Sequence, residues 1–141
     1  MGHVLDAPGA ELQMGSRAWD TAAVRAWEAG MSGRHLLVGA VVHSPSGDVV
    51  GATVTTVRSR EARVAEQHDT AVLPGHRGSG LARWMKARQT LRLHELFPRV
   101  ESVTVTVNQR NAPMLAVNRA VGYRLLRERL LVEMSTHRLR T

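Results

Sequence analysis

The stretch Thr70–Lys86 reads TAVLPGHRGSGLARWMK and decides the fold. Its apolar start, Ala71–Leu73, predicts the end of a buried strand, and Pro74 ends that strand because proline has no N–H to donate to a neighbour. A glycine-rich turn then leads into a helix predicted to begin at Leu81. Glycines let the backbone turn tightly, N–H groups at a helix start point at an anion, and Arg77 adds positive charge. The stretch therefore predicts a pyrophosphate-binding site.

Two common phosphate-binding loops do not fit this spacing. The nucleoside-triphosphate loop ends in Gly-Lys-Ser or Gly-Lys-Thr, where this chain has Ser79-Gly80-Leu81. The dinucleotide pattern G-x-G-x-x-G needs a third glycine, but Leu81-Ala82-Arg83 follows Gly80 here.

Residues 72–80, VLPGHRGSG, resemble V-x-P-x-x-R-G-x-G, the acyl-CoA signature of the GNAT N-acetyltransferase superfamily. The family often begins its loop with Gln or Arg, and Gly75 stands at that position, so one side-chain contact is missing. Residues 111–123, NAPMLAVNRAVGY, are similar to a second family motif, N-x-x-A/M-x-x-x-Y-x-x-x-G-F. Asp69, Thr70 and Val72 before the loop resemble an actinobacterial branch whose members include free-standing acetyltransferases and halves of longer tandem enzymes.

The predicted elements occur in the order that the family shows. Helices are expected over 16–30 (capped by Ser16), 80–95 and 112–121, and strands over 36–42, 49–57, 63–73, 100–107, 123–127 and 130–134. They predict an α/β (α+β) protein with a mixed, mostly antiparallel sheet flanked by helices. The resemblance implies that strands 63–73 and 100–107 form a central parallel pair that splays apart to admit pantetheine. On the helix over 80–95, the apolar side is expected to carry Leu81, Trp84, Met85 and Leu91.

Length and composition predict one domain. The chain has 141 residues, of which 43% are hydrophobic, enough for one core over 1–141. We expect 1–15 to be a poorly ordered lead-in and 35–136 to be the acetyl-CoA-binding core. Family members usually place a strand and two helices before the 36–42 strand, so this shortened front predicts a wide acceptor cleft or a homodimer that completes it.

Composition also argues against several classes of function. There is no cysteine, and the seven histidines show no metal-ligand spacing, so no metal site is expected. The net charge of +7 comes from scattered arginines with only five aromatic residues, which argues against a nucleic-acid partner. No apolar run approaches membrane-spanning length, and a cytoplasmic protein without a membrane partner is expected.

The resemblance implies acetyl-CoA as the co-substrate and assigns its binding to residues of both motifs. Pyrophosphate is expected on the glycine turn, and pantetheine along the strand end and beside the second motif. The expected coenzyme-binding residues are Val72, Arg77, Gly78, Ser79, Gly80, Leu81, Asn111 and Met114.

Three residues of the third strand are candidates for the base that deprotonates the amine. Strict alternation places Glu66, His68, Thr70 and Val72 on one face, and Gln67, Asp69 and Ala71 on the other. Glu66 is the first candidate, because it matches the spacing of a glutamate base in some family members. His68 is the second, since histidine side chains generally titrate near neutral pH, and Asp69 lies in the stretch that resembles the branch. Each has a structural alternative: Glu66 pairs with Arg63, His68 packs within the sheet, or Asp69 binds loop N–H groups.

The residue that protonates the leaving sulfur is missing. The family commonly uses a tyrosine four residues before its G-F pair, and Asn118 stands there, whereas the chain's single tyrosine is Tyr123. An amide is not an acid at neutral pH, so Asn118 cannot protonate the sulfur. Either water or another side chain is the proton donor, or the chain binds CoA with little turnover. The leading hypothesis is an acyltransferase that acetylates a primary amine of a small molecule or peptide by direct attack in a ternary complex. A CoA-binding sensor or half-domain is the alternative, ahead of a nucleic-acid-binding protein.

Overall fold

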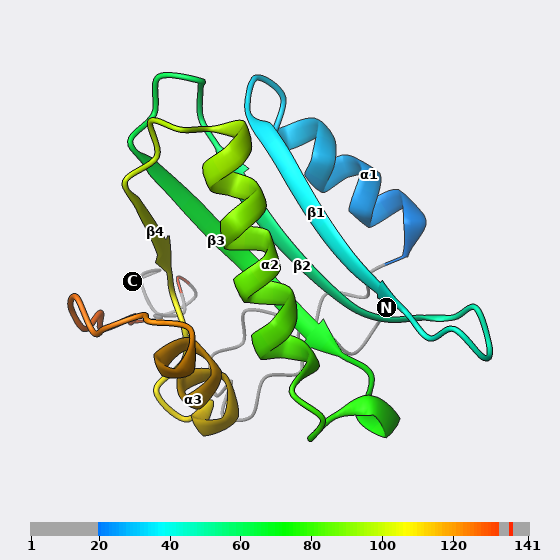
Figure 1. The fold of residues 1–141 in the computed structure, drawn as a ribbon. Coiled ribbons are helices and arrows are strands. Elements are labelled where there is room, and N and C mark those ends of the chain that lie inside the picture. The colour runs from blue at the N-terminus through cyan, green and yellow to red at the C-terminus, as the bar shows by residue number, and fades with distance from the viewer. Residues whose placement is uncertain (1–19, 133–135, 137–141) are drawn as a thin grey trace.

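The structure is a computed structural model that describes residues 20–132 and 136. The elements are α1 (Thr21–Gly30), β1 (His35–Val42), β2 (Val49–Val57), β3 (Val64–Val72), the 3₁₀ turn η1 (Pro74–His76), α2 (Leu81–Leu96), β4 (Ser102–Val105) and α3 (Ala112–Ala120) (Figure 1). The expected lead-in over 1–15 lies outside the described residues.

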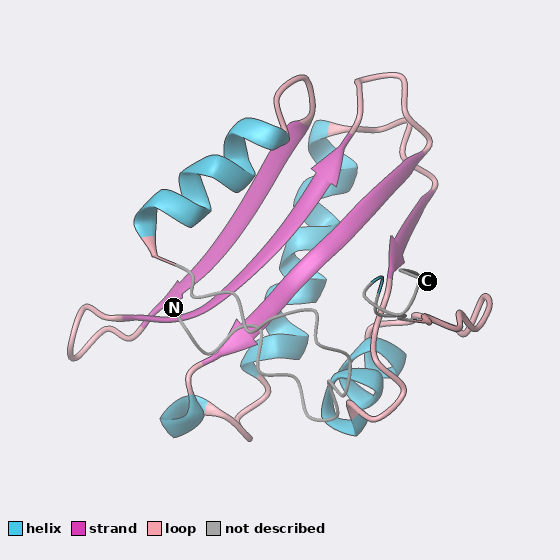
Figure 2. Cartoon of the chain, turned by 180° about the vertical axis from the view of Figure 1, so that it is seen from behind, coloured by secondary structure: helices cyan, strands magenta, loops and turns pink. Residues whose placement is uncertain are grey.

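The four strands form one mixed sheet in the order β1-β2-β3-β4. β1 pairs with β2 and β2 with β3 in antiparallel directions, whereas β4 runs parallel to β3. α2 connects the two parallel strands and crosses one face of the sheet, and Figure 2 shows the opposite face with α2 behind it. The predicted mixed sheet with a parallel pair flanked by helices is confirmed.

The hydrophobic core lies where α2 meets the sheet. Val57 and Ala65 contribute from the strands, and Leu93 and Phe97 from the end of α2 and its cap. The buried side of α2 carries Met85, Lys86, Gln89 and Leu93. Our expectation for the apolar side was wrong in part, because Trp84 and Leu91 are 55% and 60% exposed. Two polar side chains therefore face the sheet in their place.

A β-bulge in β3 changes which residues share a face. Thr53 pairs with Thr70 and Thr55 with Gln67, so two residues of β3 lie opposite one residue of β2. Thr70 consequently reaches the side of Gln67, to which its hydroxyl is hydrogen-bonded. The strict alternation expected for this strand is wrong beyond His68.

The first helix begins at a later residue than the helix predicted over 16–30. α1 begins at Thr21, because Asp20 is extended and its side chain accepts a hydrogen bond from the N–H of Ala23 at 2.8 Å. The predicted cap Ser16 lies outside the described residues.

The prediction of two C-terminal strands, over 123–127 and 130–134, is wrong for the residues that the structure describes. Residues 123–132 form no helix or strand, and residues 133 and 134 lie outside the description. The apolar side chains of this segment are exposed: Leu125, Leu126, Leu130, Leu131 and Val132. Apolar residues do not form a strand without a surface on which to bury them.

None of the helices within the described ranges has the length and apolar character needed to cross a bilayer.

Candidate active site

The two parallel strands, β3 and β4, part at the edge of the described sheet that β4 forms. Their pairing runs only from Val64–Ser102 to Gln67–Val105, although β3 continues to Val72. Beyond the last pair lies a cavity of about 160 Å³. It is lined by His68, Asp69, Thr70, Lys86, Val105, Thr106, Val107, Asn108, Asn111 and Met114. The opening therefore brings together parts of β3, α2, the chain after β4, and α3.

The glycine turn leads from the end of β3 into α2. Gly78 and Gly80 have φ angles of +83° and +81°, which other residues rarely adopt. Gly80 is the N-cap of α2 and has no side chain that could accept a hydrogen bond. The backbone N–H groups of the first turn, from Leu81 onward, therefore point out of the end of the helix with no capping side chain. A Cβ added at either glycine would meet nothing within 4 Å. The turn therefore leaves room for a ligand beside outward-facing N–H groups.

Arg77 is fixed beside this turn. Its Nε donates a 2.8 Å hydrogen bond to the carbonyl of Val72, which ties the guanidinium to the end of β3. Within the described residues no carboxylate forms an ion pair with it. Ser79 is turned inward, since its hydroxyl donates to the carbonyl of His76 at 3.1 Å. An anion at this turn would therefore meet Arg77 and backbone N–H groups.

The predicted residues of the second motif lie at the cavity. Asn111 is the N-cap of α3, and its side-chain oxygen accepts a 3.3 Å hydrogen bond from the N–H of Met114. Both residues line the cavity. The capping bond gives Asn111 a structural role in addition to any contact with a ligand.

The three candidate bases occupy different environments. Glu66 does not line the cavity; it lies between Arg34 and Arg58, with ion-pair distances of 3.3 and 3.5 Å. Arg63, the partner considered from the sequence, pairs with Glu101 instead.

His68 and Asp69 both line the cavity. His68 Nε2 shares a 2.7 Å hydrogen bond with the hydroxyl of Thr56, and its imidazole lies edge-on to Trp27 with ring centroids 5.8 Å apart. Loss of water raises the pKa of the Asp69 carboxyl, and a charge on His68 partly opposes this shift. The cavity thus has two titratable groups on its β3 side.

Lys86 lines the cavity although the motifs do not identify it. It is the chain's only lysine, and it is 2% exposed. Burial lowers the pKa of its amine to about 8. The available signal was its helical spacing, because Lys86 is adjacent to Met85 and seven residues before Leu93, both of which face the sheet.

Lys86 belongs to a buried hydrogen-bond network centred on Gln67. The amide oxygen of Gln67 accepts from Lys86 Nζ at 3.1 Å and from the Tyr123 hydroxyl at 2.7 Å. The amide nitrogen donates to the hydroxyls of Thr53 at 2.8 Å and Thr70 at 3.1 Å. All four hydrogen-bonding positions of this amide are therefore used.

The other residues of the second motif complete this network. Asn118 is buried, and its side-chain oxygen accepts a short hydrogen bond from Lys86 Nζ. The aromatic ring of Tyr123 lies 5.3 Å from the same nitrogen. Burial raises the pKa of Tyr123 to about 12. The tyrosine and Asn118 thus both hold Lys86.

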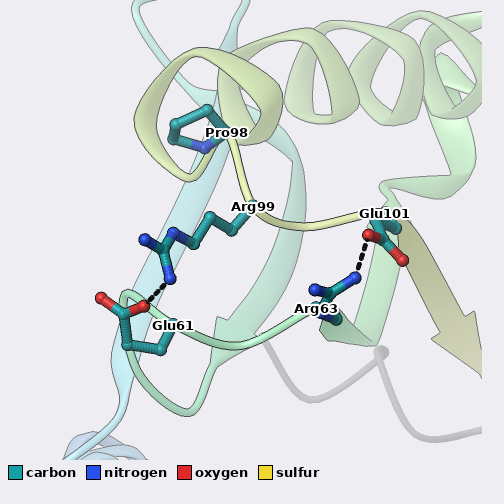
Figure 3. A pocket seen from close by; sticks show the side chains of 5 residues that line it. All are labelled: Glu61, Arg63, Pro98, Arg99 and Glu101. Carbon is teal, nitrogen blue, oxygen red and sulfur yellow. Dashed lines mark hydrogen bonds and ion pairs between the residues drawn. The ribbon is translucent and has the colours of Figure 1, made fainter.

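A second hollow, of about 200 Å³, lies at the other end of β3 (Figure 3). It is formed by the loops before β3 and β4, where Arg63 bonds Glu101 at 2.6 Å and Arg99 pairs with Glu61. These exposed side chains neutralise one another, and the glycine turn follows the opposite end of β3. The opening between the parted strands is therefore the candidate functional site.

Solved acetyltransferases have a similar fold. A tandem GNAT protein from the clavulanic acid biosynthesis pathway is 28% identical, with a TM-score of 0.69 over 79% of this chain. This chain spans only 35% of the length of that protein. An acetyltransferase of Trypanosoma brucei is 18% identical, with a TM-score of 0.62 and 83% of each chain covered.

The aminoglycoside N-acetyltransferase AAC(6′)-Iy, solved with a bisubstrate analogue that contains CoA, is also similar. It is 17% identical, with a TM-score of 0.65 over 89% of this chain and 86% of that one. No protein-family model matches the sequence, and no curated protein does.

The parted parallel strands and the turn that follows them define the acetyltransferase class of α+β folds. Within that class, the chain belongs to the GNAT superfamily, as its two motifs predicted.

Proposed function

We propose that the protein is an acetyl-CoA-dependent N-acetyltransferase that acetylates a primary amine of a small molecule or peptide in a ternary complex. The observation that carries this proposal is the continuity of the site: the strands part after Gln67 and Val105, and the uncapped glycine turn follows from the same strand. A long coenzyme with an anionic diphosphate and an extended arm fits this order of features.

The turn supplies the contacts that a diphosphate needs. Gly78, Gly80 and Leu81 would offer backbone N–H groups, and Arg77 would offer the donors of its guanidinium that are not bound to Val72. The pantetheine arm would then follow the end of β3 toward Asn111 and Met114, which line the cavity. Acetyl-CoA supplies the activated acetyl group when bound.

His68 is our first candidate for the base, with Asp69 beside it. Both line the cavity, whereas Glu66 is held by two arginines away from it. Because Thr56 and Trp27 fix the imidazole, His68 is positioned to accept a proton from an amine that enters from this side. Glu66 remains a candidate for acting through an intervening water.

Calorimetric titration with CoA and a thiol-release assay test the proposal together. We expect binding of CoA, and thiol release from acetyl-CoA with at least one member of a panel of small amines, aminoglycosides and peptides. Aminoglycosides are included because AAC(6′)-Iy is an aminoglycoside N-acetyltransferase. A protein that shows no affinity for CoA would refute the assignment of the site.

A CoA-binding half-domain with little turnover is the second candidate. The match to 35% of a tandem GNAT protein and the asparagine at position 118 both favour it. Binding of CoA without thiol release on any amine would support this alternative.

We also propose that the protein is cytoplasmic and acts as a homodimer, in which the second chain would cover apolar surface that the described chain exposes. β4 is an edge strand, and the segment 125–132 exposes four leucines and Val132. Sedimentation equilibrium is expected to give twice the mass of one chain, and a monomer at all concentrations would refute this part of the proposal.

A further inference from the structure

The buried amine of Lys86 faces the cavity with only neutral partners. Two of its hydrogens are donated to the amide oxygens of Gln67 and Asn118. Among the described residues no carboxylate pairs with it, and the side chain is 2% exposed. A buried ammonium without a counter-ion is unfavourable. Because the Lys86 ammonium lies beside a cavity, it would favour the binding of an anionic ligand there.

Acetyl transfer from coenzyme A creates an anion of this kind. When the amine attacks the thioester, the C–S bond breaks and its electron pair stays on sulfur. A thiolate leaves more easily when a nearby acid supplies a proton, and such an acid typically contributes about 10²- to 10⁴-fold in rate.

We propose that Lys86, held at the cavity by Gln67 and Asn118, donates a proton to the sulfur of coenzyme A as the acetyl group leaves. This inference rests on the proposed acetyltransferase function and adds the residue that protonates the leaving group. The ammonium becomes a neutral amine, the sulfur becomes a thiol, and the proton lost by the acetylated amine passes to the base or to water. Lys86 then regains a proton from solvent.

The acidity of Lys86 suits this step. The thiol of cysteine has a pKa of roughly 8.5 and serves here as the reference for the thiol of coenzyme A; proton transfer is efficient when donor and acceptor have similar values. Burial lowers the pKa of Lys86 to about 8, near that of the thiol. Tyr123 is unsuited because its pKa is raised to about 12 and its hydroxyl already donates to Gln67.

The other titratable groups around the cavity come from β3. His68 and Asp69 line it on that side, and the lining residues at the end of β4 and just after it, Val105 to Val107, carry no charge. On α2, the neighbouring buried polar residue is the neutral Gln89, which bonds the carbonyl of Leu37. Lys86 is therefore the one ammonium among the described residues that line the cavity.

The first test measures the acidity of the thiol of bound coenzyme A. Thiolate absorbs in the ultraviolet, and the wild-type complex is titrated between about pH 6 and 10, where Tyr123, the only tyrosine, stays protonated. A positive charge near the sulfur lowers a thiol pKa, by roughly 1 to 3 for close pairs. We expect the bound thiol to be that much more acidic in the wild type than in Lys86→Met.

Two further variants separate charge and fold from proton donation. Lys86→Arg keeps a cation but does not release its proton, because the pKa of a guanidinium lies far above that of an ammonium. It is expected to retain an acidic bound thiol and to lose about 10²- to 10⁴-fold in acetyl transfer. Gln89→Met removes another buried polar group from α2 and is expected to leave the thiol pKa unchanged. It also controls for structural damage.

The possible results separate the role of Lys86 from the proposed function. Equal thiol pKa values in wild type and Lys86→Met, or wild-type turnover in Lys86→Arg, would overturn the role of Lys86 alone. A stable acetyl group on Lys86 in the intact mass would also overturn it, because the amine would then be an acceptor. If Lys86→Met does not fold, Lys86→Arg decides by its rate. A wild type that does not bind CoA, or binds it without acetylating any amine, would overturn the proposed function and this inference together.

Discussion

Replacing Arg77 with alanine is expected to weaken CoA binding by about 10- to 150-fold. Arg77 Nε is bound to the Val72 carbonyl, which leaves the terminal nitrogens of its guanidinium for the diphosphate. A hydrogen bond to a charged group contributes about 1.5–3 kcal/mol, and every 1.4 kcal/mol is a tenfold change in affinity. The variant also loses the bond to Val72, but Arg77 is exposed, so the fold should tolerate the change.

Isothermal titration of CoA at fixed ionic strength measures this loss. Arg92→Ala is the matched control, because Arg92 lies on α2, pairs with Glu95 at 3.0 Å on the surface, and carries the same charge. Its effect on affinity is expected to stay under about twofold, since exposed pairs contribute little. Glu66→Ala, away from the turn, is likewise expected to have little effect on binding.

The reasoning would be refuted by equal losses in Arg77→Ala and Arg92→Ala, which would mean that CoA responds only to overall charge. Comparable losses in Arg77→Ala and Glu66→Ala would show that the roles of these two residues are wrongly assigned.

The remaining predictions concern stability. Gly80→Ala is expected to cost about 1–2 kcal/mol in thermal unfolding, because φ is +81° there and open space rules out a steric clash. Tyr123→Phe removes the 2.7 Å hydrogen bond to Gln67 and is expected to lower the free energy of unfolding in urea by roughly 1 kcal/mol. An unchanged free energy of unfolding would contradict that bond. The pKa of Lys86 is lowered from 10.5 to about 8, so between these values the unfolded chain binds more protons and stability rises with pH. Relative to Lys86→Met, the wild type should therefore gain up to about 1 kcal/mol per pH unit between pH 8 and 10, and parallel pH profiles would contradict this.

The sequence predicted the features that depend on local backbone chemistry. The proline and glycines around Arg77 indicated the turn, Gly122 marked the end of α3 with a φ of +101°, and the order of strands and helices followed from the hydrophobic pattern. These signals come from residues a few positions apart, so they do not require knowledge of the tertiary structure.

Features that depend on packing were not predictable in this way. The side of α2 that faces the sheet contains both Lys86 and Gln89, while Trp84 faces solvent, so hydrophobic periodicity identified the buried side of α2 only in part. The bulge in β3 is a property of its pairing with β2, and the alternation of a single strand gives no sign of it.

The same limit applies to the chain after α3. Leu125 and Leu130 have the composition of strand residues, but a strand also needs a partner, and the described chain offers none that they pair with.

The saturated amide of Gln67 has a consequence for how this protein diverges from its relatives. Each of its four bonds ends on a different side chain, and no other residue type at position 67 reproduces two donors and two acceptors in that geometry. Thr53, Thr70, Lys86 and Tyr123 should consequently be inherited as a set, so that a homologue lacking the lysine has also changed the glutamine. Such co-inheritance would mark out a lineage within the superfamily by a handful of interior positions.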